Sequence, residues 1–218
     1  MDTIQRRSWA VLSLSLVVEL LVVTRPRLAG LSADTLCLVD LVLQMALLLG
    51  IPAAMVKYVL GGGLHDVGLC LAGARHWLRW WTPLFAVSLL LALLCTRLPS
   101  IHEAYPRLPA ARSSAGWFIL STLTFASYGL AWEFFFRGFL LFGIEQRFGS
   151  WAVVVQGVPC ALMHWGKPNF ELLCALPAAI LLGIMALRAR SIVPGFVLHA
   201  SVALCVNLGC LFWPLGSA

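Results

Sequence analysis

Two oppositely charged side chains lie four residues apart within an apolar stretch of this 218-residue chain. Glu133 and Arg137 enclose three phenylalanines, and positions i and i+4 share one face of a helix, so the two side chains are predicted to pair. A charge near the centre of a bilayer costs about 2.5–3.5 kcal/mol on insertion scales, and such residues usually pair with each other, face a bundle interior or mark a reaction or transport path. The placement of this pair therefore predicts a function for it.

Two histidines, His164 and His199, lie in later segments of the same apolar half. Polar groups in a membrane must find partners within the protein, so both imidazoles are expected to meet Glu133 and Arg137. A desolvated carboxylate beside Arg can act as a general base, and a neutral imidazole can orient a water or stabilise an oxyanion. This set predicts hydrolysis, with Glu133, His164 and His199 as catalytic candidates and Arg137 as their support.

Each of these residues also has a structural interpretation when it is taken alone. A Glu–Arg pair at i, i+4 can be a clasp, and His164, which precedes a Gly-Lys-Pro turn, can cap a helix or extend to the interface. Glu19 and Asp40 have no companion pattern, so they are predicted to be structural.

The amino-acid composition indicates whether the chain folds in water or in a membrane. Hydrophobic residues make up 61% of it, charged residues 11%, and the mean hydropathy is +0.93. A soluble domain would carry about 25% charged residues. We predict a single integral-membrane domain over residues 1–218, folded as an all-α polytopic transmembrane bundle of about seven or eight helices. The expected segments are 8–24, 36–58, 78–95, 115–131, 132–147, 151–165, 172–188 and 192–213.

The net charge of +6 arises from Lys and Arg residues that lie mostly in connecting loops. In a membrane protein such residues orient the chain, so the charge predicts no nucleic-acid partner. The seven cysteines form no CxxC pair and no zinc-like spacing. We expect no cofactor; if a divalent metal binds, its ligands are predicted to be Glu133, His164 and His199, although an HExxH motif is absent.

The order and spacing of these residues resemble the CAAX protease and bacteriocin-processing (CPBP, also Abi) family of intramembrane proteases, over about residues 116–207. That family carries an EExxxR motif, an FxxxH motif, and a later His followed four residues on by Asn or a similar residue. Glu133 to Arg137 resembles the first motif, 160–164 the second, and 194–199 the third.

Three positions depart from the family pattern. Trp132 replaces the first glutamate, Cys160 replaces the phenylalanine, and Ala203 replaces the asparagine. The resemblance implies that the first glutamate and first histidine activate water, that the last histidine and asparagine stabilise the oxyanion, and that the second glutamate and the arginine support them.

Three explanations for Trp132 remain open. Glu133 serves as the base in a variant site, or Glu171, seven residues after His164, supplies the missing carboxylate, or the chain binds peptide without cutting it. Asn207 lies eight residues after His199, about 12 Å along a helix, so it can support the same face but cannot replace the missing asparagine. We expect activity to be retained, because the buried Arg137 and both histidines would otherwise have no reason to persist in lipid.

The leading hypothesis is thus a multi-pass endopeptidase of the inner or plasma membrane. The resemblance implies a membrane-embedded or lipid-modified substrate: a prenylated carboxyl terminus, a leader peptide or a membrane protein. Two alternatives are a non-catalytic binding or scaffold protein on the same fold and a small proton- or ion-coupled transporter. The transporter is disfavoured because the two halves of the chain show no matching repeats.

Overall fold

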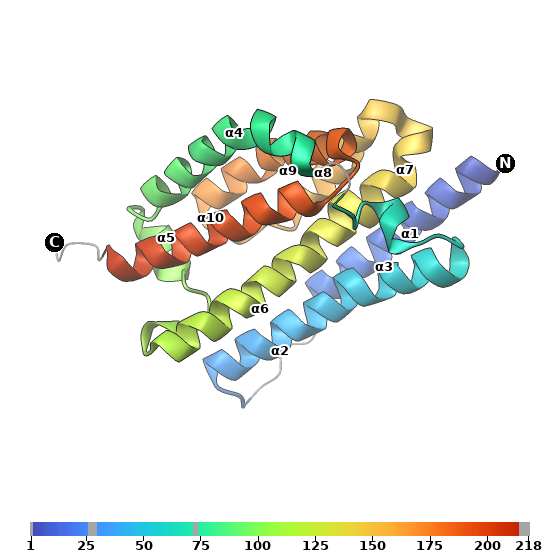
Figure 1. Cartoon of the computed structure of the whole chain (residues 1–218). Coiled ribbons are helices and arrows are strands. Elements are labelled where there is room, and N and C mark those ends of the chain that lie inside the picture. Colours follow the sequence, from blue (N-terminus) through green and yellow to red (C-terminus); the bar gives the residue numbers. More distant parts are fainter. Residues whose placement is uncertain (1, 26–29, 72–73, 214–218) are drawn as a thin grey trace.

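The computed structural model describes residues 2–25, 30–71 and 74–213, with the backbone alone between 74 and 80. The predicted all-α fold is confirmed: the described chain forms long helices and contains no strand (Figure 1). The principal helices are α1 (Thr3–Thr24), α2 (Ala33–Met45), α3 (Ile51–Ala54), α4 (Ala74–Cys95), α5 (Pro99–Ala104), α6 (Ala115–Glu133), α7 (Leu141–Phe148), α8 (Ala152–Leu162), α9 (Asn169–Ala189) and α10 (Val193–Phe212).

Short helical turns of other kinds join or extend these helices. The wider π-helical turns are η1 (Ala46–Gly50), η2 (Met55–Val59) and η5 (Phe134–Leu140), and the 3-10 turns are η3 (Leu64–Val67), η4 (Pro109–Arg112) and η6 (Gly149–Trp151). The helix that begins as α2 thus continues without a break to Val59.

Five helical stretches of the described chain are long and apolar enough to cross a membrane: Thr3–Thr24, Ala33–Val59, Ala115–Leu162, Asn169–Ala189 and Val193–Phe212. A shorter apolar helix covers Trp81–Cys95. Large hydrophobic side chains such as Leu16, Leu90 and Leu123 are exposed on the outside of the bundle, where lipid tails would cover them. The protein is an integral membrane protein with several passes.

The predicted division between segments 115–131 and 132–147 is wrong. The chain stays helical from Ala115 through η5 to Phe148, because this stretch contains no proline to end the helix, and the glycines at 129 and 138 are accommodated within it. The turn widens directly after Glu133 instead, and π-helical turns of this kind occur often at functional sites. The charged pair therefore lies in the middle of one long helix.

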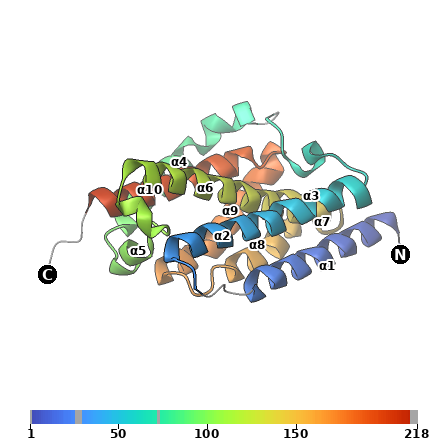
Figure 2. The ribbon, with the colours of Figure 1, turned by 90° about the horizontal axis from the view of Figure 1, so that it is seen from below.

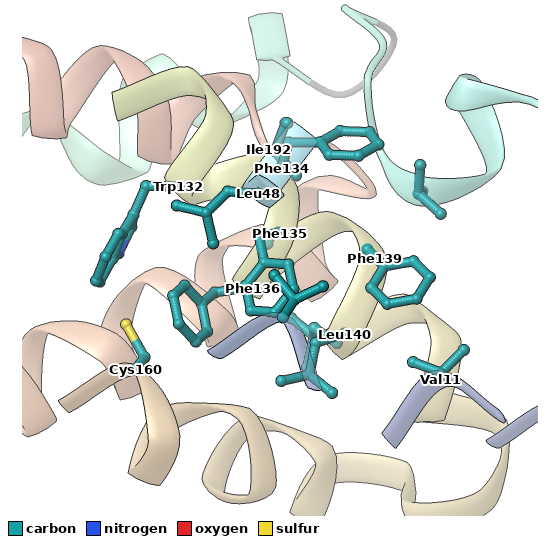
Figure 3. Packing of buried hydrophobic residues seen from close by; sticks show 14 of the residues in the cluster. Val11, Leu48, Trp132, Phe134, Phe135, Phe136, Phe139, Leu140, Cys160 and Ile192 are labelled. Atoms are coloured by element: carbon teal, nitrogen blue, oxygen red, sulfur yellow. The ribbon is translucent and has the colours of Figure 1, made fainter. Parts of the chain in front are cut away.

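The core surrounds η5. Phe134, Phe135, Phe136 and Phe139 are all inaccessible to solvent and lie against side chains from α1, η1 and α8 (Figure 3). Dense aromatic packing on every side fixes the rotation of this helix, since overpacked or shifted rings in a close-packed core are costly. The orientation of Glu133 and Arg137 follows from that fixed rotation.

Helices distant in the sequence lie side by side around α6 (Figures 1 and 2). The last helix, α10, packs against α4, α6 and α9, while α8 packs against α9 and α2 packs against α6. This packing of the helices brings the second half of the chain together around one polar region.

Asp40 of α2, predicted to be structural, pairs with Arg25 and accepts a hydrogen bond from Gln44.

Candidate active site

Glu133 lies at the end of α6 with no exposed surface. Its Oε1 atom is 3.3 Å from Nη1 of Arg137 and 3.1 Å from Nδ1 of His199, which comes from α10. The ion pair predicted from the i, i+4 spacing is confirmed, and the predicted convergence of Glu133 with His199 is confirmed as well. The carboxylate thus joins two helices through one oxygen.

A glycine allows this approach. A Cβ atom on Gly195, in the first turn of α10, would lie 3.0 Å from Oε2 of Glu133. A hydrogen in that place lets the amino-terminal end of α10 approach the carboxylate closely. The amino-terminal end of α10 carries the positive end of the helix dipole, which interacts favourably with a nearby carboxylate.

Several polar atoms of this cluster lack hydrogen-bond partners. Within the described part of the chain, Oε2 of Glu133 and Nε of Arg137 make no hydrogen bond, although both side chains are buried. Buried polar atoms are nearly always hydrogen-bonded, and an exception calls for a water, an ion or a ligand. These atoms can therefore form hydrogen bonds with a bound polar molecule.

His164 follows the end of α8 and is held differently. Its Nδ1 atom is 2.9 Å from the carbonyl oxygen of Cys160, so Nδ1–H donates to that carbonyl and leaves Nε2 as an acceptor. Burial, together with the positive charge of Lys167, lowers the pKa of His164 to about 4. The ring is therefore neutral at pH 7, with a lone pair available to a water or a substrate.

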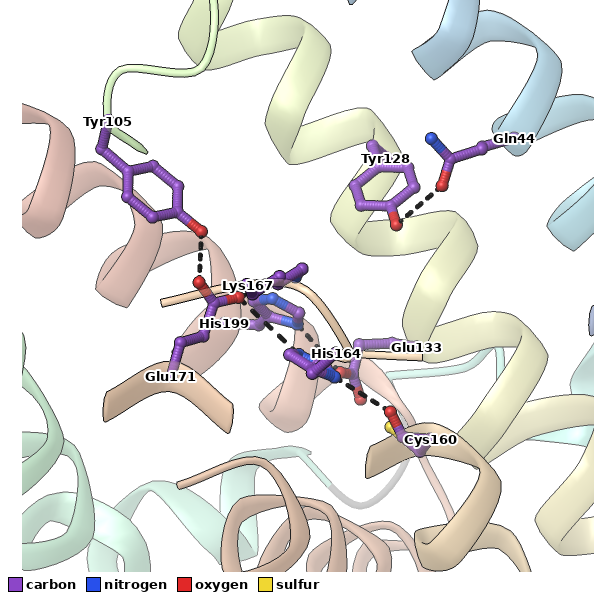
Figure 4. A network of polar contacts seen from close by, with 9 residues as sticks. All are labelled: Gln44, Tyr105, Tyr128, Glu133, Cys160, His164, Lys167, Glu171 and His199. Atoms are coloured by element: carbon purple, nitrogen blue, oxygen red, sulfur yellow. Dashed lines mark hydrogen bonds and ion pairs between the residues drawn. The ribbon is translucent and has the colours of Figure 1, made fainter. Parts of the chain in front are cut away.

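Glu171, in the first turn of α9, is the carboxylate that His164 faces. Its Oε1 atom is 3.9 Å from Nε2 of His164 and 2.7 Å from Nζ of Lys167 (Figure 4). Tyr105 donates a hydrogen bond of 2.7 Å to the other oxygen. The site thus contains two glutamate–histidine pairs, Glu133 with His199 and Glu171 with His164.

The two pairs are close enough to interact, since the charge of His199 also lowers the pKa of His164. Trp132 lies beside them, with its ring edge-on to His164 at 5.3 Å between centroids and 5.8 Å from Nζ of Lys167. The residue that replaces the first glutamate of the family motif is therefore an apolar wall next to His164.

The structure differs from the sequence-based predictions at Asn207 and Tyr105. Asn207 lies apart from the histidines, at a groove of about 180 Å³ between α6 and α10, and the described residues show no contact between Asn207 and either imidazole. Tyr105 was missed, because it lies in a proline-containing connection 66 residues before Glu171 and no periodicity marks it. Only the folded chain reveals this contact.

Glu133, His164 and His199 are the residues predicted as ligands if a divalent metal binds. In the residues that the structure covers, no group of three His, Cys, Asp or Glu side chains is arranged to hold a metal ion. The predicted set of Glu133, His164 and His199 therefore does not form such a group.

Long apolar helices around a buried cluster of carboxylates and imidazoles define a polytopic membrane protein with a polar site inside its bundle. Residues 112–205 match the family described as type II CAAX prenyl endopeptidase Rce1-like. Over these residues, which carry the predicted motifs, the chain is similar to the CAAX protease family. The match contains Glu133, Arg137, His164, Glu171 and His199. No curated protein and no solved structure matches the chain.

Proposed function

We propose that the protein is an intramembrane endopeptidase that hydrolyses a peptide bond of a prenylated or otherwise membrane-associated substrate with an activated water. The observation that carries the proposal is the contact between the fully buried Glu133 and the partly exposed His199, made across 66 residues and placed close to His164. Similarity to a CAAX endopeptidase family supports the same reaction class.

The two histidines suit different parts of hydrolysis. Nδ1–H of His199 donates to Glu133, which fixes the orientation of the ring and leaves Nε2 for the substrate. Such an imidazole can stabilise the negative charge that develops on a carbonyl oxygen under attack. His164 is neutral, and its Nε2 lone pair can accept a hydrogen from water. Arg137 fixes the orientation and charge of Glu133.

The substrate class follows from the family and from the surroundings of the site. A prenylated peptide with a CAAX carboxyl terminus is anchored in the bilayer by its lipid, so it reaches a site between membrane helices without leaving the membrane. We further propose the inner or plasma membrane as its location.

The test uses the full chain in lipid vesicles with a fluorogenic, farnesylated CAAX peptide. We expect each of the variants Glu133→Gln, His164→Ala and His199→Ala to lower kcat/KM about 100-fold or more, since acid–base and oxyanion groups each contribute on that order. The matched controls are Glu103→Gln and His65→Ala, whose exposed side chains lie outside the site.

One observation favours a second candidate, a binding or scaffold protein without hydrolytic activity. Trp132 removes the carboxylate that the family motif would place next to His164. Binding of the farnesylated peptide by the wild-type protein without any turnover, unchanged in the three site variants, would support the scaffold and reject the endopeptidase.

A further inference from the structure

We propose that Glu171 and His164 together hold the water that attacks the substrate, and that Tyr105 is the positioning residue that keeps Glu171 in place. This inference rests on the proposed function and deepens it, because it identifies the base that Trp132 cannot supply.

The first argument is the distance between the two side chains. Nε2 of His164 and Oε1 of Glu171 are 3.9 Å apart, which is too long for a direct hydrogen bond and short enough for one water to bridge. Because Nδ1 of His164 is used by the Cys160 carbonyl, Nε2 is an acceptor. One water can then donate one hydrogen to His164 and the other to the carboxylate.

The second argument is that Glu171 is oriented on both sides. Lys167, one turn before it, contacts Oε1 at 2.7 Å, and Tyr105 donates to Oε2 at 2.7 Å. Burial and the nearby negative charge of Glu171 raise the pKa of Tyr105 well above its usual value, so its hydroxyl remains a donor at all working pH values. A carboxylate held by two donors presents a fixed oxygen to the bridging water.

The third argument is that Tyr105 is itself anchored. Arg112 donates hydrogen bonds to the backbone carbonyls of Tyr105 and His102, the latter at 2.8 Å, and a longer one of 3.4 Å to the carbonyl of Cys210 on α10. The connection between α4 and α6 is thereby tied to the bundle. Tyr105 extends from that connection to Glu171 on α9.

The fourth argument is that the other nearby carboxylate, Glu133, is already engaged by other side chains. Glu133 is buried without exposed surface, and its Oε1 contacts Arg137 and His199. Trp132 covers His164 from the side of α6. Among the residues that the structure describes, Glu171 is the carboxylate in contact with His164.

The chemical step balances with water alone. The water oxygen forms a bond to the carbonyl carbon while one of its protons moves to Oε1 of Glu171, and the negative charge develops on the carbonyl oxygen beside His199. When the intermediate collapses, the C–N bond breaks and the proton passes from Glu171 to the leaving amine. The products are a carboxylic acid and an amine, and proton exchange between them gives a carboxylate and an ammonium group.

Activity is tested with the farnesylated peptide in vesicles. We expect Glu171→Gln to lower kcat about 100-fold or more and Tyr105→Phe to lower it about 10-fold, with smaller changes in KM. Glu103→Gln and Tyr58→Phe are the matched controls, since both side chains are exposed away from the site. Glu171→Asp is expected to restore part of the activity, which loss of a merely structural contact would not produce.

A second readout does not depend on turnover. The charged groups that act on His164 are Lys167, Glu171 and His199. Nitrogen-15 NMR of the folded protein should show the pKa of His164 falling in Glu171→Gln and rising in Lys167→Met. Unchanged titration in both variants, or wild-type turnover by Glu171→Gln where His164→Ala is inactive, would overturn the pairing alone. A wild-type protein that cleaves no substrate would instead overturn the proposed function.

Discussion

The two histidines of the site are chemically unlike because their Nδ1 atoms have different partners. His199 donates to the carboxylate of Glu133, whereas His164 donates to the neutral carbonyl of Cys160 and lies near Lys167, whose charge helps to lower the pKa of His164. Opposite environments for like groups are the usual way to separate the acid and base roles of a site.

The depressed pKa of His164 predicts how stability depends on pH. The pKa lies near 6.5 in the unfolded chain and at about 4 in the folded one, so the unfolded state binds more protons between these values. Stability from this residue is complete above pH 6.5 and is lost as the pH falls toward 4. Thermal unfolding in detergent should show wild type losing about 1–2 kcal/mol more than His164→Gln between pH 7 and pH 5. Equal losses would contradict a neutral, buried His164.

Sequence reasoning succeeded at this scale where a general rule applied. The pairing of Glu133 with Arg137 follows from helix geometry, and the approach of His199 follows from the cost of leaving a carboxylate alone in lipid. Tyr105 and the role of Lys167 depend on how a connecting segment folds over α9, and no local pattern specifies that contact.

At the scale of elements, the site depends on the close approach of α10 to the π-helical turn η5. The wide turn starts directly after Glu133, and α10 meets it with Gly195 in its first turn. The sequence indicates both helices through their apolar length, but it contains no signal for a π turn. The predicted division into 115–131 and 132–147 rests instead on fitting each apolar run to the length of one membrane span.

The approach of α10 can be tested by Gly195→Ala. The added Cβ would lie 3.0 Å from Oε2 of Glu133, so we expect a loss of stability of about 1–3 kcal/mol and a lower kcat as His199 moves. The matched control is Gly129→Ala on α6, where a Cβ would meet nothing within 4 Å. Because alanine is the better helix former, the control should be neutral or more stable. Equal melting temperatures for both variants would show that α10 does not need this glycine.

At the scale of the whole molecule, α4 separates two connecting segments. Tyr105, which contacts Glu171, follows Glu103 on the connection after α4, whereas His65 lies on the segment before α4. The two segments are therefore expected on opposite sides of the membrane.

Labelling tests this arrangement. In a background with the seven native cysteines replaced by serine, His65→Cys and Glu103→Cys should react with a membrane-impermeant maleimide from opposite faces of the membrane, because the 22-residue α4 between them is long enough to cross a bilayer. Ser113→Cys is the control and should react from the same face as Glu103→Cys. Reaction of all three positions from one face would show that α4 does not cross the membrane.

The contact between Glu133 and His199 also has a consequence for biosynthesis. The ribosome delivers Glu133 well before His199, and α8 and α9 must enter the bilayer between them. Until α10 inserts, the carboxylate has Arg137 one turn away but no imidazole, and no carbonyl of a substrate can be polarised at this place. Under the proposed function, the site is therefore complete only after α10 has packed against α6.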